Sequence, residues 1–263
     1  MVDVIIQYFR VKRTPGTPDF NILQKRQEEY SYCLRKNLEY TGIRKIHVLI
    51  ENDEDIVEMK EQGFDLEHTK LNIHMLGKRM NYRDAFHYAN TFLDGRVVIV
   101  LHTDIYLTGG FDRITTEHLH KKMYALARTN NVDGKCTGRG IRTQIIDGKV
   151  YCGTFDGFAF TTPLPDKILE LSDHVQNVWG AENKLLYTFK TNGYEVSTPN
   201  VLNMVHWHMT DVRPNQNWNW ITIDGTLIPH KSEFYYKHLL NNPDIVGGLI
   251  PKKLGTSIMT NTL

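Results

Sequence analysis

The chain has 263 residues, of which 23% are charged and 41% hydrophobic, and its formal net charge is +1. This is globular material with enough chain for one large domain or two small ones. The near-zero net charge excludes bulk attraction to nucleic acid or to a membrane surface, and no segment approaches the ~20 apolar residues of a membrane span.

The start of the chain and its cysteines indicate the compartment. The first residues, MVDVIIQYFRVKR, lack the basic start and long apolar core of a signal peptide and are typical of a strand. The chain has an odd number of cysteines at wide spacing, namely Cys33, Cys136 and Cys152. This pattern favours reduced thiols over a disulfide framework. We therefore expect a cytoplasmic protein.

The first 107 residues alternate between predicted strands and helices. Strands are expected at 2–10, 43–50, 71–76 and 97–101, with helices at 21–41, from 53 onward and at 81–93. This alternation predicts a parallel sheet with right-handed crossovers. No GxGxxG follows the first strand and no GxxxxGK[ST] occurs, which argues against a dinucleotide fold and a phosphate-loop NTPase.

The second half has a less regular pattern. We expect a helix at 114–128, a polar Gly-rich loop at 130–140, a hairpin at 143–150 and strand-like spacing at 151–161. Further helices are expected at 166–175 and 182–191, then a short strand at 194–196 and an extended segment at 204–209. Beyond 213 we expect an irregular cap over the sheet or an acceptor cleft, with no regular structure in the last ten residues.

The segment at 97–101 is the strongest strand signal in the chain. It is an unbroken apolar, β-branched run, as in strands buried on both faces of a parallel sheet. It stops abruptly at His102, Thr103 and Asp104. Open α/β sheets bind ligands at the carboxyl ends of their strands, so Asp104 is a candidate ligand residue. A role as a turn or helix-cap residue is equally open.

Two histidines and a glutamate are further candidates. His206 and His208 share one face if their segment is extended. With Asp104 they could form a divalent-metal site with oxygen and nitrogen ligands, although a structural or surface role is as open. Glu182 follows Trp179 and Gly180 at a predicted helix start, where it is either a first-turn charge or a general base.

Other polar positions carry weaker signals. Asp156 is either a turn residue or a polar contact in a sugar pocket. Arg79, Tyr82 and Asp84 open a predicted helix, where an arginine can contact an anion. A solvated helix start is the alternative for these three residues.

Five motifs occur in a recognisable order. They are RMNYRD at 79–84, VVIVLHTDIYL at 97–107, GTFDGFAF at 153–160, WGAEN at 179–183 and GYEVSTPNVLNMVHWH at 193–208. In this order and spacing the chain resembles, over about residues 1–212, the GT-A class of nucleotide-sugar-dependent glycosyltransferases. The likeness is greatest to small stand-alone glycosyltransferase-like proteins of large DNA viruses and some microbes. It implies an α/β, GT-A-like (Rossmann-like) fold with a mostly parallel central sheet flanked by helices and a smaller mixed second half.

The resemblance also implies a role for each matched residue. Asp104 corresponds to the last Asp of the DxD motif, which binds Mn²⁺ or Mg²⁺ bridging the donor diphosphate, whereas His102 replaces the first Asp. His208 corresponds to the late histidine that completes the metal site, with His206 as the alternative. Glu182 matches the position of the base in inverting members.

The resemblance implies two further sets of contacts. Asp156 matches an aspartate that contacts the acceptor or the donor and is a second candidate for catalysis. The residues expected to line the nucleotide pocket are Tyr8, Arg10, Arg79, Tyr82, Asp84, His102, Thr103 and Asp104.

The expected function is transfer of a sugar from a nucleoside-diphosphate sugar to a glycan or other hydroxyl acceptor, assisted by a divalent metal. A UDP-sugar is the favoured donor. The alternatives are a non-catalytic nucleotide-sugar-binding module and a metallohydrolase built on Asp104, His206 and His208. We expect one domain at 1–212, with a nucleotide-binding half at 1–107 and an acceptor and metal half at 108–212, and a packed extension at 213–263. Neither nucleic acid nor a membrane is an expected partner, and a viral member would act in the host cytoplasm.

Overall fold

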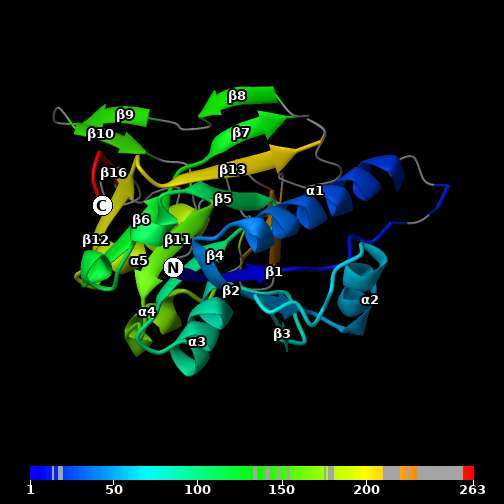
Figure 1. Cartoon of the computed structure of the whole chain (residues 1–263). Helices are drawn as coiled ribbons and strands as arrows, with labels where there is room; N and C mark the ends of the chain where they lie inside the picture. Colours follow the sequence, from blue (N-terminus) through cyan, green and yellow to red (C-terminus); the bar gives the residue numbers. More distant parts are fainter. Residues whose placement is uncertain are drawn as a thin grey trace.

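The structure is a computed structural model of the chain. It describes residues 1–13, 15–16, 20–132, 135–139, 143–146, 149–152, 155–174, 176, 181–209, 220–223, 226–229 and 257–263. Figure 1 shows an α/β fold in which helices flank a large central sheet and a smaller sheet lies alongside. The predicted fold class, a Rossmann-like sheet flanked by helices with a smaller mixed part, is confirmed.

The amino-terminal half consists of parallel strands joined by helices, as predicted. Its elements are β1 (Val2–Gln7), α1 (Phe20–Glu39), β2 (Ile43–Ile50), α2 (Asp53–Glu61), β3 (Leu71–Met75), α3 (Tyr82–Phe92) and β4 (Val97–Leu101). β1 pairs in parallel with β2 and β4, and β2 pairs in parallel with β3. Every residue of β1 and β4 is buried, because helices cover both faces of this part of the sheet.

The second half adds mostly strands. Its elements are β5 (Ile105–Gly109), β6 (Lys122–Leu126), β7 (Thr129–Val132), β8 (Lys135–Arg139), β9 (Thr143–Ile146), β10 (Lys149–Cys152), β11 (Gly157–Thr161), α4 (Asp166–Leu171), α5 (Ala181–Thr191), β12 (Glu195–Pro199), β13 (Asn203–His208), β14 (Trp220–Ile223), β15 (Thr226–Pro229) and β16 (Ser257–Thr260). Within the described ranges, the central sheet has the order β3-β2-β1-β4-β11-β6-β12-β16-β10-β9, and the smaller sheet has the order β5-β13-β7-β8.

Three predictions for the second half were wrong. The segment at 114–128 is a 3₁₀ turn at Glu117–Leu119 followed by β6, whose last four residues are buried between β11 and β12. A short apolar run fits a buried strand as well as a helix, and only the neighbouring strands decide between them. The segment at 130–140, expected to be a loop, contains most of β7 and all of β8, since pairing with β13 and with each other overrides their polar composition.

The third error concerns the end of the chain, which we expected to lack regular structure. Ser257–Thr260 forms β16, which pairs with β12 and β10 in the central sheet. By contrast, the predicted hairpin is confirmed as the antiparallel pair β9 and β10, although its turn at 147–148 lies outside the described residues. The proposed boundary between 1–212 and 213–263 stays a prediction.

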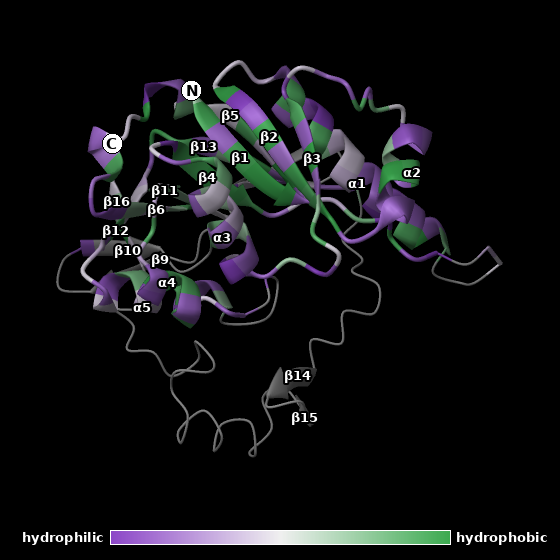
Figure 2. Cartoon of the chain, turned by 90° about the horizontal axis from the view of Figure 1, so that it is seen from below, coloured by the Kyte–Doolittle hydropathy of each residue, from purple (hydrophilic) through white to green (hydrophobic). Residues whose placement is uncertain are grey.

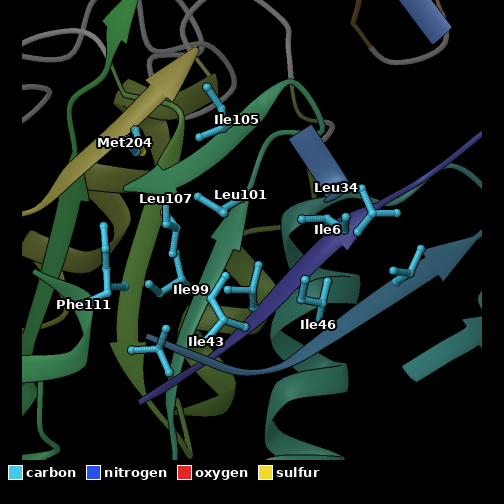
Figure 3. Packing of buried hydrophobic residues seen from close by; sticks show 14 of the residues in the cluster. Ile6, Leu34, Ile43, Ile46, Ile99, Leu101, Ile105, Leu107, Phe111 and Met204 are labelled. Carbon is cyan, nitrogen blue, oxygen red and sulfur yellow. The ribbon is translucent and has the colours of Figure 1, made fainter. Parts of the chain in front are cut away.

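The hydrophobic core lies on both faces of the central sheet. Successive residues of β4 alternate between the faces. Ile99 and Leu101 join the cluster that contains Leu34 of α1 (Figure 3), whereas Val98 joins the cluster that contains Phe86 of α3. Figure 2 shows hydrophobic residues along β1, β2 and β4 and hydrophilic ones on the outer helices. Within the described residues, no helix is both long enough and apolar enough to span a bilayer.

Candidate functional site

Three neighbouring strands of the central sheet bring polar residues to one edge. β4 and β6 end at this edge and β11 begins there, because β11 is antiparallel to both. His102 and Asp104 follow β4, Arg128 follows β6 and Asp156 precedes β11. His102, Asp104 and Asp156 are buried. Buried ionisable groups at the carboxyl edge of a parallel sheet mark a candidate ligand site.

The smaller sheet brings two histidines to the same edge. β13 pairs antiparallel with β5 and parallel with β7. Its alternating burial places His206 and His208 on one buried side, with 2% and 8% of their surfaces exposed. The prediction that both imidazoles share a face is confirmed. Their ring centroids lie 3.8 Å apart.

Asp104, His206 and His208 form a candidate metal site. One ligand atom from each lies within 4.8 Å of the others. Nε2 of His206 is 3.0 Å from Oδ2 of Asp104, and Nδ1 of the same ring is 3.4 Å from Oδ1 of Asn130. A second partner of this kind orients a ligating imidazole and selects its tautomer. One carboxylate and two imidazoles suit a divalent transition ion such as Mn²⁺ better than Mg²⁺.

Arg26 of α1 reaches into the same cluster. Its Nη2 donates to Oδ2 of Asp104 at 2.7 Å, and its Nη1 lies 3.3 Å from Nδ1 of His208. Nη1 also donates to Oε2 of Glu29 at 2.5 Å, and Nε donates to the Tyr30 hydroxyl at 3.1 Å. The guanidinium therefore places a permanent positive charge beside the candidate metal ligands.

Glu29 completes this cluster from α1. It is buried, and its Oε1 accepts a hydrogen bond of 2.7 Å from the backbone N–H of Met209 and lies 3.7 Å from Nδ1 of His208. The sequence analysis missed both Arg26 and Glu29. Charged residues in a mostly polar helix usually face solvent, so the sequence carries no signal that could have identified them.

The charges of the cluster fix its ionisation at neutral pH. Burial alone would raise the pKa of the Asp104 carboxyl, but His206 and Arg26 hold it well below its usual value. Burial opposes ionisation of Glu29 too, and His208 and Arg26 lower the pKa of that carboxyl. Burial lowers the pKa of His206 against the opposing pull of Asp104. The two carboxylates are thus ionised and His206 is neutral, which are the forms that bind metals.

A second cluster adjoins the first through His102. Nδ1 of His102 lies 3.4 Å from Oδ1 of Asp156, and Nε2 lies 4.0 Å from Oε1 of Glu182. The backbone N–H of His102 donates to the Asp156 carbonyl at 3.0 Å, and Arg128 donates to Oδ1 of Asp156. Arg128 is a further residue that the sequence analysis missed, because only the insertion of β11 beside β6 brings it to Asp156.

Glu182 reaches this cluster because α5 runs back along the sheet. β12, which follows α5, begins at the opposite edge, where Glu195 pairs with Lys122. The first turn of α5 is therefore at the carboxyl edge, and Glu182 is in that turn. Burial raises the pKa of Glu182 to about 7, although His102 favours the ionised form. Burial would lower the pKa of His102, but Asp156 and Glu182 raise it.

Three buried polar atoms beside Glu182 lack a hydrogen-bond partner within the described part of the chain. They are Nε2 of His102, Oδ2 of Asp156 and the hydroxyl of Tyr82. Burial raises the pKa of Tyr82 well above its usual value, and the nearby charges of Glu182 and Asp156 add to this. Buried polar groups are costly when unpaired, so this cluster is suited to a polar ligand.

Some residues predicted to line a nucleotide pocket lie along the same edge. The Thr103 hydroxyl donates to the Gln7 carbonyl at 2.7 Å, and the Gln7 amide donates to Glu51 at 3.2 Å. Glu51 in turn pairs with Arg79 at 2.7 Å, and the Arg79 guanidinium lies 3.9 Å from the centroid of the Phe9 ring. The structure thus connects Thr103 with Arg79 through two intervening residues.

The remaining predicted pocket residues make internal contacts. The Tyr8 hydroxyl lies 2.8 Å from Oγ of Ser31, and Nε of Arg10 lies 3.4 Å from Oε2 of Glu58. Asp84 closes the capping box at the start of α3 and pairs with Lys78 at 2.8 Å. A nucleotide-binding role for Tyr8, Arg10 and Asp84 stays a prediction.

The comparisons with known proteins give distant likenesses. No protein-family model matches the sequence, and no curated protein matches it. Similar solved structures include HddC from Yersinia pseudotuberculosis, at 13% identity and a TM-score of 0.38, covering 66% of this chain and 81% of that one. The structure of the same protein complexed with GMP-PN is 15% identical, with a TM-score of 0.43, and the match covers 66% of this chain and 81% of that one.

A third similar structure is a putative glucose-1-phosphate thymidylyltransferase from Bacillus anthracis in complex with a sucrose. It is 10% identical, with a TM-score of 0.47, and the match covers 80% of this chain and 87% of that one. All three likenesses are too distant to assign a function, so the description of the fold rests on its own topology.

Proposed function

We propose that this protein is a glycosyltransferase that transfers a sugar from a nucleoside-diphosphate sugar, with a UDP-sugar favoured, to a hydroxyl acceptor. The observation that supports it most is the pairing of two clusters at one sheet edge. One contains a half-buried carboxylate of raised pKa, Glu182, and the other contains the ligand set of Asp104, His206 and His208. Crevices at such edges bind nucleotides in many α/β proteins.

Glu182 is the proposed general base. The acceptor hydroxyl loses its proton as its oxygen attacks the anomeric carbon, and a carboxylate with a pKa near the working pH is suited to accept that proton. The Glu182 side chain is 20% exposed, whereas that of His102 is 4% exposed. Glu182 is therefore the more accessible of the two to an acceptor. On the buried side of Glu182, Nε2 of His102 lies 4.0 Å from its Oε1, and Nδ1 of His102 lies 3.4 Å from Oδ1 of Asp156.

The leaving group is the nucleoside diphosphate, which takes the electron pair of the broken bond to the anomeric carbon. Asp104, His206 and His208 would hold a divalent ion, Mn²⁺ more readily than Mg²⁺, which when bound supplies Lewis-acid stabilisation of that charge. Arg26, whose Nη2 is 2.7 Å from Oδ2 of Asp104 in this structure, would supply a second positive charge to the donor phosphates. Arginine binds phosphate groups through strong, often bidentate, charge-assisted hydrogen bonds.

Sugar turnover in the parent and in Glu182→Gln tests the proposal. The assay measures release of the nucleoside diphosphate from a panel of nucleotide sugars, with Mn²⁺ and with simple sugar acceptors. We expect Glu182→Gln to bind donor normally and to lower turnover by ~10²-fold or more, the usual effect of losing a general base. Glu195→Gln is the matched control, because that side chain is 60% exposed and pairs with Lys122 far from the site.

Two alternative functions give different results in this assay. Donor binding without turnover in the parent would indicate a non-catalytic nucleotide-sugar-binding module. Hydrolysis of a substrate that lacks a nucleotide, lost in His208→Ala, would indicate a metallohydrolase, which the two-histidine, one-carboxylate ligand set also suits. Equal turnover in the parent and Glu182→Gln would remove Glu182 from the mechanism and leave Asp156 as the candidate base.

A further inference from the structure

The candidate metal ligands already contact a cation of the protein itself, the Arg26 guanidinium. Oδ2 of Asp104 accepts a hydrogen bond of 2.7 Å from Nη2 of Arg26 and lies 3.0 Å from Nε2 of His206. Nη1 of Arg26 lies 3.3 Å from Nδ1 of His208. The guanidinium thus contacts two of the three ligand side chains, and it shares the Asp104 oxygen with the third.

A guanidinium in this position and a divalent ion exclude each other. An ion bound to Oδ2 of Asp104 would lie within a few ångströms of the positive charge of Arg26. Like charges at that separation repel strongly even at the effective dielectric constant of a partly buried site. In addition, Asp104 cannot direct the same lone pairs to both cations.

Arg26 has partners that it can keep if it leaves Asp104. It bonds to Glu29 and to the Tyr30 hydroxyl, both on its own helix, and its guanidinium carbon lies 4.8 Å from the centroid of the Tyr30 ring. Its side chain is 18% exposed, compared with 10% for Asp104 and 3% for His206. Among these residues, Arg26 has the most room to move toward solvent without losing all its contacts.

We propose that Arg26 is a built-in competitor for the divalent cation, so that metal enters the site only when the guanidinium withdraws from Asp104. Metal alone would then bind the parent weakly. A donor diphosphate would strengthen metal binding by giving Arg26 another anionic partner. This inference rests on the metal-ligand role of the proposed function, but it does not depend on sugar transfer.

Two variants remove the competitor. Arg26→Met removes the positive charge, but it leaves two buried carboxylates, Asp104 and Glu29, without their cationic partner. Unpaired buried charges of this kind can prevent folding. The double variant Arg26→Met/Glu29→Gln removes one positive and one negative charge together, and the glutamine can still accept from the backbone of Met209. The matched control is Arg35→Met on the same helix, because Arg35 lies over the Phe64 ring, 4.9 Å from its centroid, and contacts none of the ligands.

The experiment titrates Mn²⁺ alone, without nucleotide, by calorimetry and by the shift in melting temperature. We expect the double variant to bind Mn²⁺ about tenfold more tightly than the parent, or better, as relief of a close like-charge contact implies. Arg35→Met should match the parent. Adding His208→Ala to the double variant should abolish the gain.

Three results would overturn the inference. Equal affinities in the parent and the double variant would show that Arg26 does not compete, and tighter binding by the parent would show that Arg26 supports the ligands. Absence of binding in every variant would show that the three residues do not form a metal site. None of these results measures turnover, so each is distinct from a failure of the proposed sugar transfer.

Discussion

Replacing Glu182 by glutamine should change how the free energy of unfolding depends on pH. Burial raises the pKa of Glu182 from 4.5 to about 7 in the folded state. Between these pH values the folded protein holds a proton that the unfolded chain has released, so the parent loses stability as the pH rises through this window. Below the window the group is neutral in both states. Glutamine does not ionise, so the variant avoids the loss.

The size of the effect follows from the site. A change in pKa from 4.5 to about 7 corresponds to roughly 3 kcal/mol at pH values above 7. Two features reduce it. The side chain is 20% exposed, so water screens part of the charge, and Nε2 of His102, 4.0 Å away, loses an anionic neighbour in the variant. We therefore expect the free energy of unfolding of Glu182→Gln to exceed that of the parent by about 1–2 kcal/mol at pH 8 and by almost nothing at pH 4.5.

Urea unfolding between pH 4.5 and 8.5, followed by circular dichroism, measures this difference. Glu195→Gln is again the control, since it removes an exposed carboxylate that is not in the site. A Glu182→Gln advantage that does not grow with pH would refute the reasoning. It would mean that Glu182 is solvated in the folded protein and that its pKa is not raised.

Two further changes have effects that the structure defines. Asp104→Asn should destabilise the protein by roughly 3 kcal/mol at pH 7, because Arg26 and His206 lose a buried anion. Since the pKa of Asp104 is lowered in the folded state, urea unfolding should show this deficit shrinking as the pH falls toward that pKa. Gly110→Ala should lower stability by about 1–3 kcal/mol, because φ is +91° and the new Cβ would meet a backbone carbonyl. Gly193→Ala, with φ +83° but open space, should lower stability by less, and thermal unfolding of both variants compares the two losses.

The sequence predicted the parts of the fold that depend on local pattern. The buried run of β4 and the segment that places His206 and His208 on one face were readable, because strand periodicity is a property of neighbouring residues. The prediction of β6 as a helix failed because local pattern was the only guide, and a short apolar run fits the period of a helix as well as that of a strand. Only its place between β11 and β12 makes it a strand.

The sequence did not reveal which residues meet at the site. Arg26 and Asp104 are 78 positions apart, and the packing of α1 beside β5 and β13 brings them together. Arg128 contacts Asp156 only because β11 inserts between β4 and β6. Contacts of this kind depend on strand order, which a single sequence does not encode in any local pattern.

The central claim is that the edge beside Asp104 binds a nucleotide diphosphate together with a divalent ion. The most direct test is a melting scan of the parent and Asp104→Asn with UDP and GDP, each in Mn²⁺ and in EDTA. At a ligand concentration of about 100 times Kd the expected stabilisation is ~2.7 kcal/mol, which for a chain of this size raises the melting temperature by roughly 5–10 °C.

Because Arg26 and the diphosphate both influence the metal ligands, UDP with Mn²⁺ should raise the melting temperature by more than the sum of the separate shifts. In Asp104→Asn, the part of this rise in melting temperature that depends on Mn²⁺ should be lost. A shift with UDP that is the same in EDTA would contradict the metal role of Asp104, and no shift with any nucleotide would contradict the account as a whole.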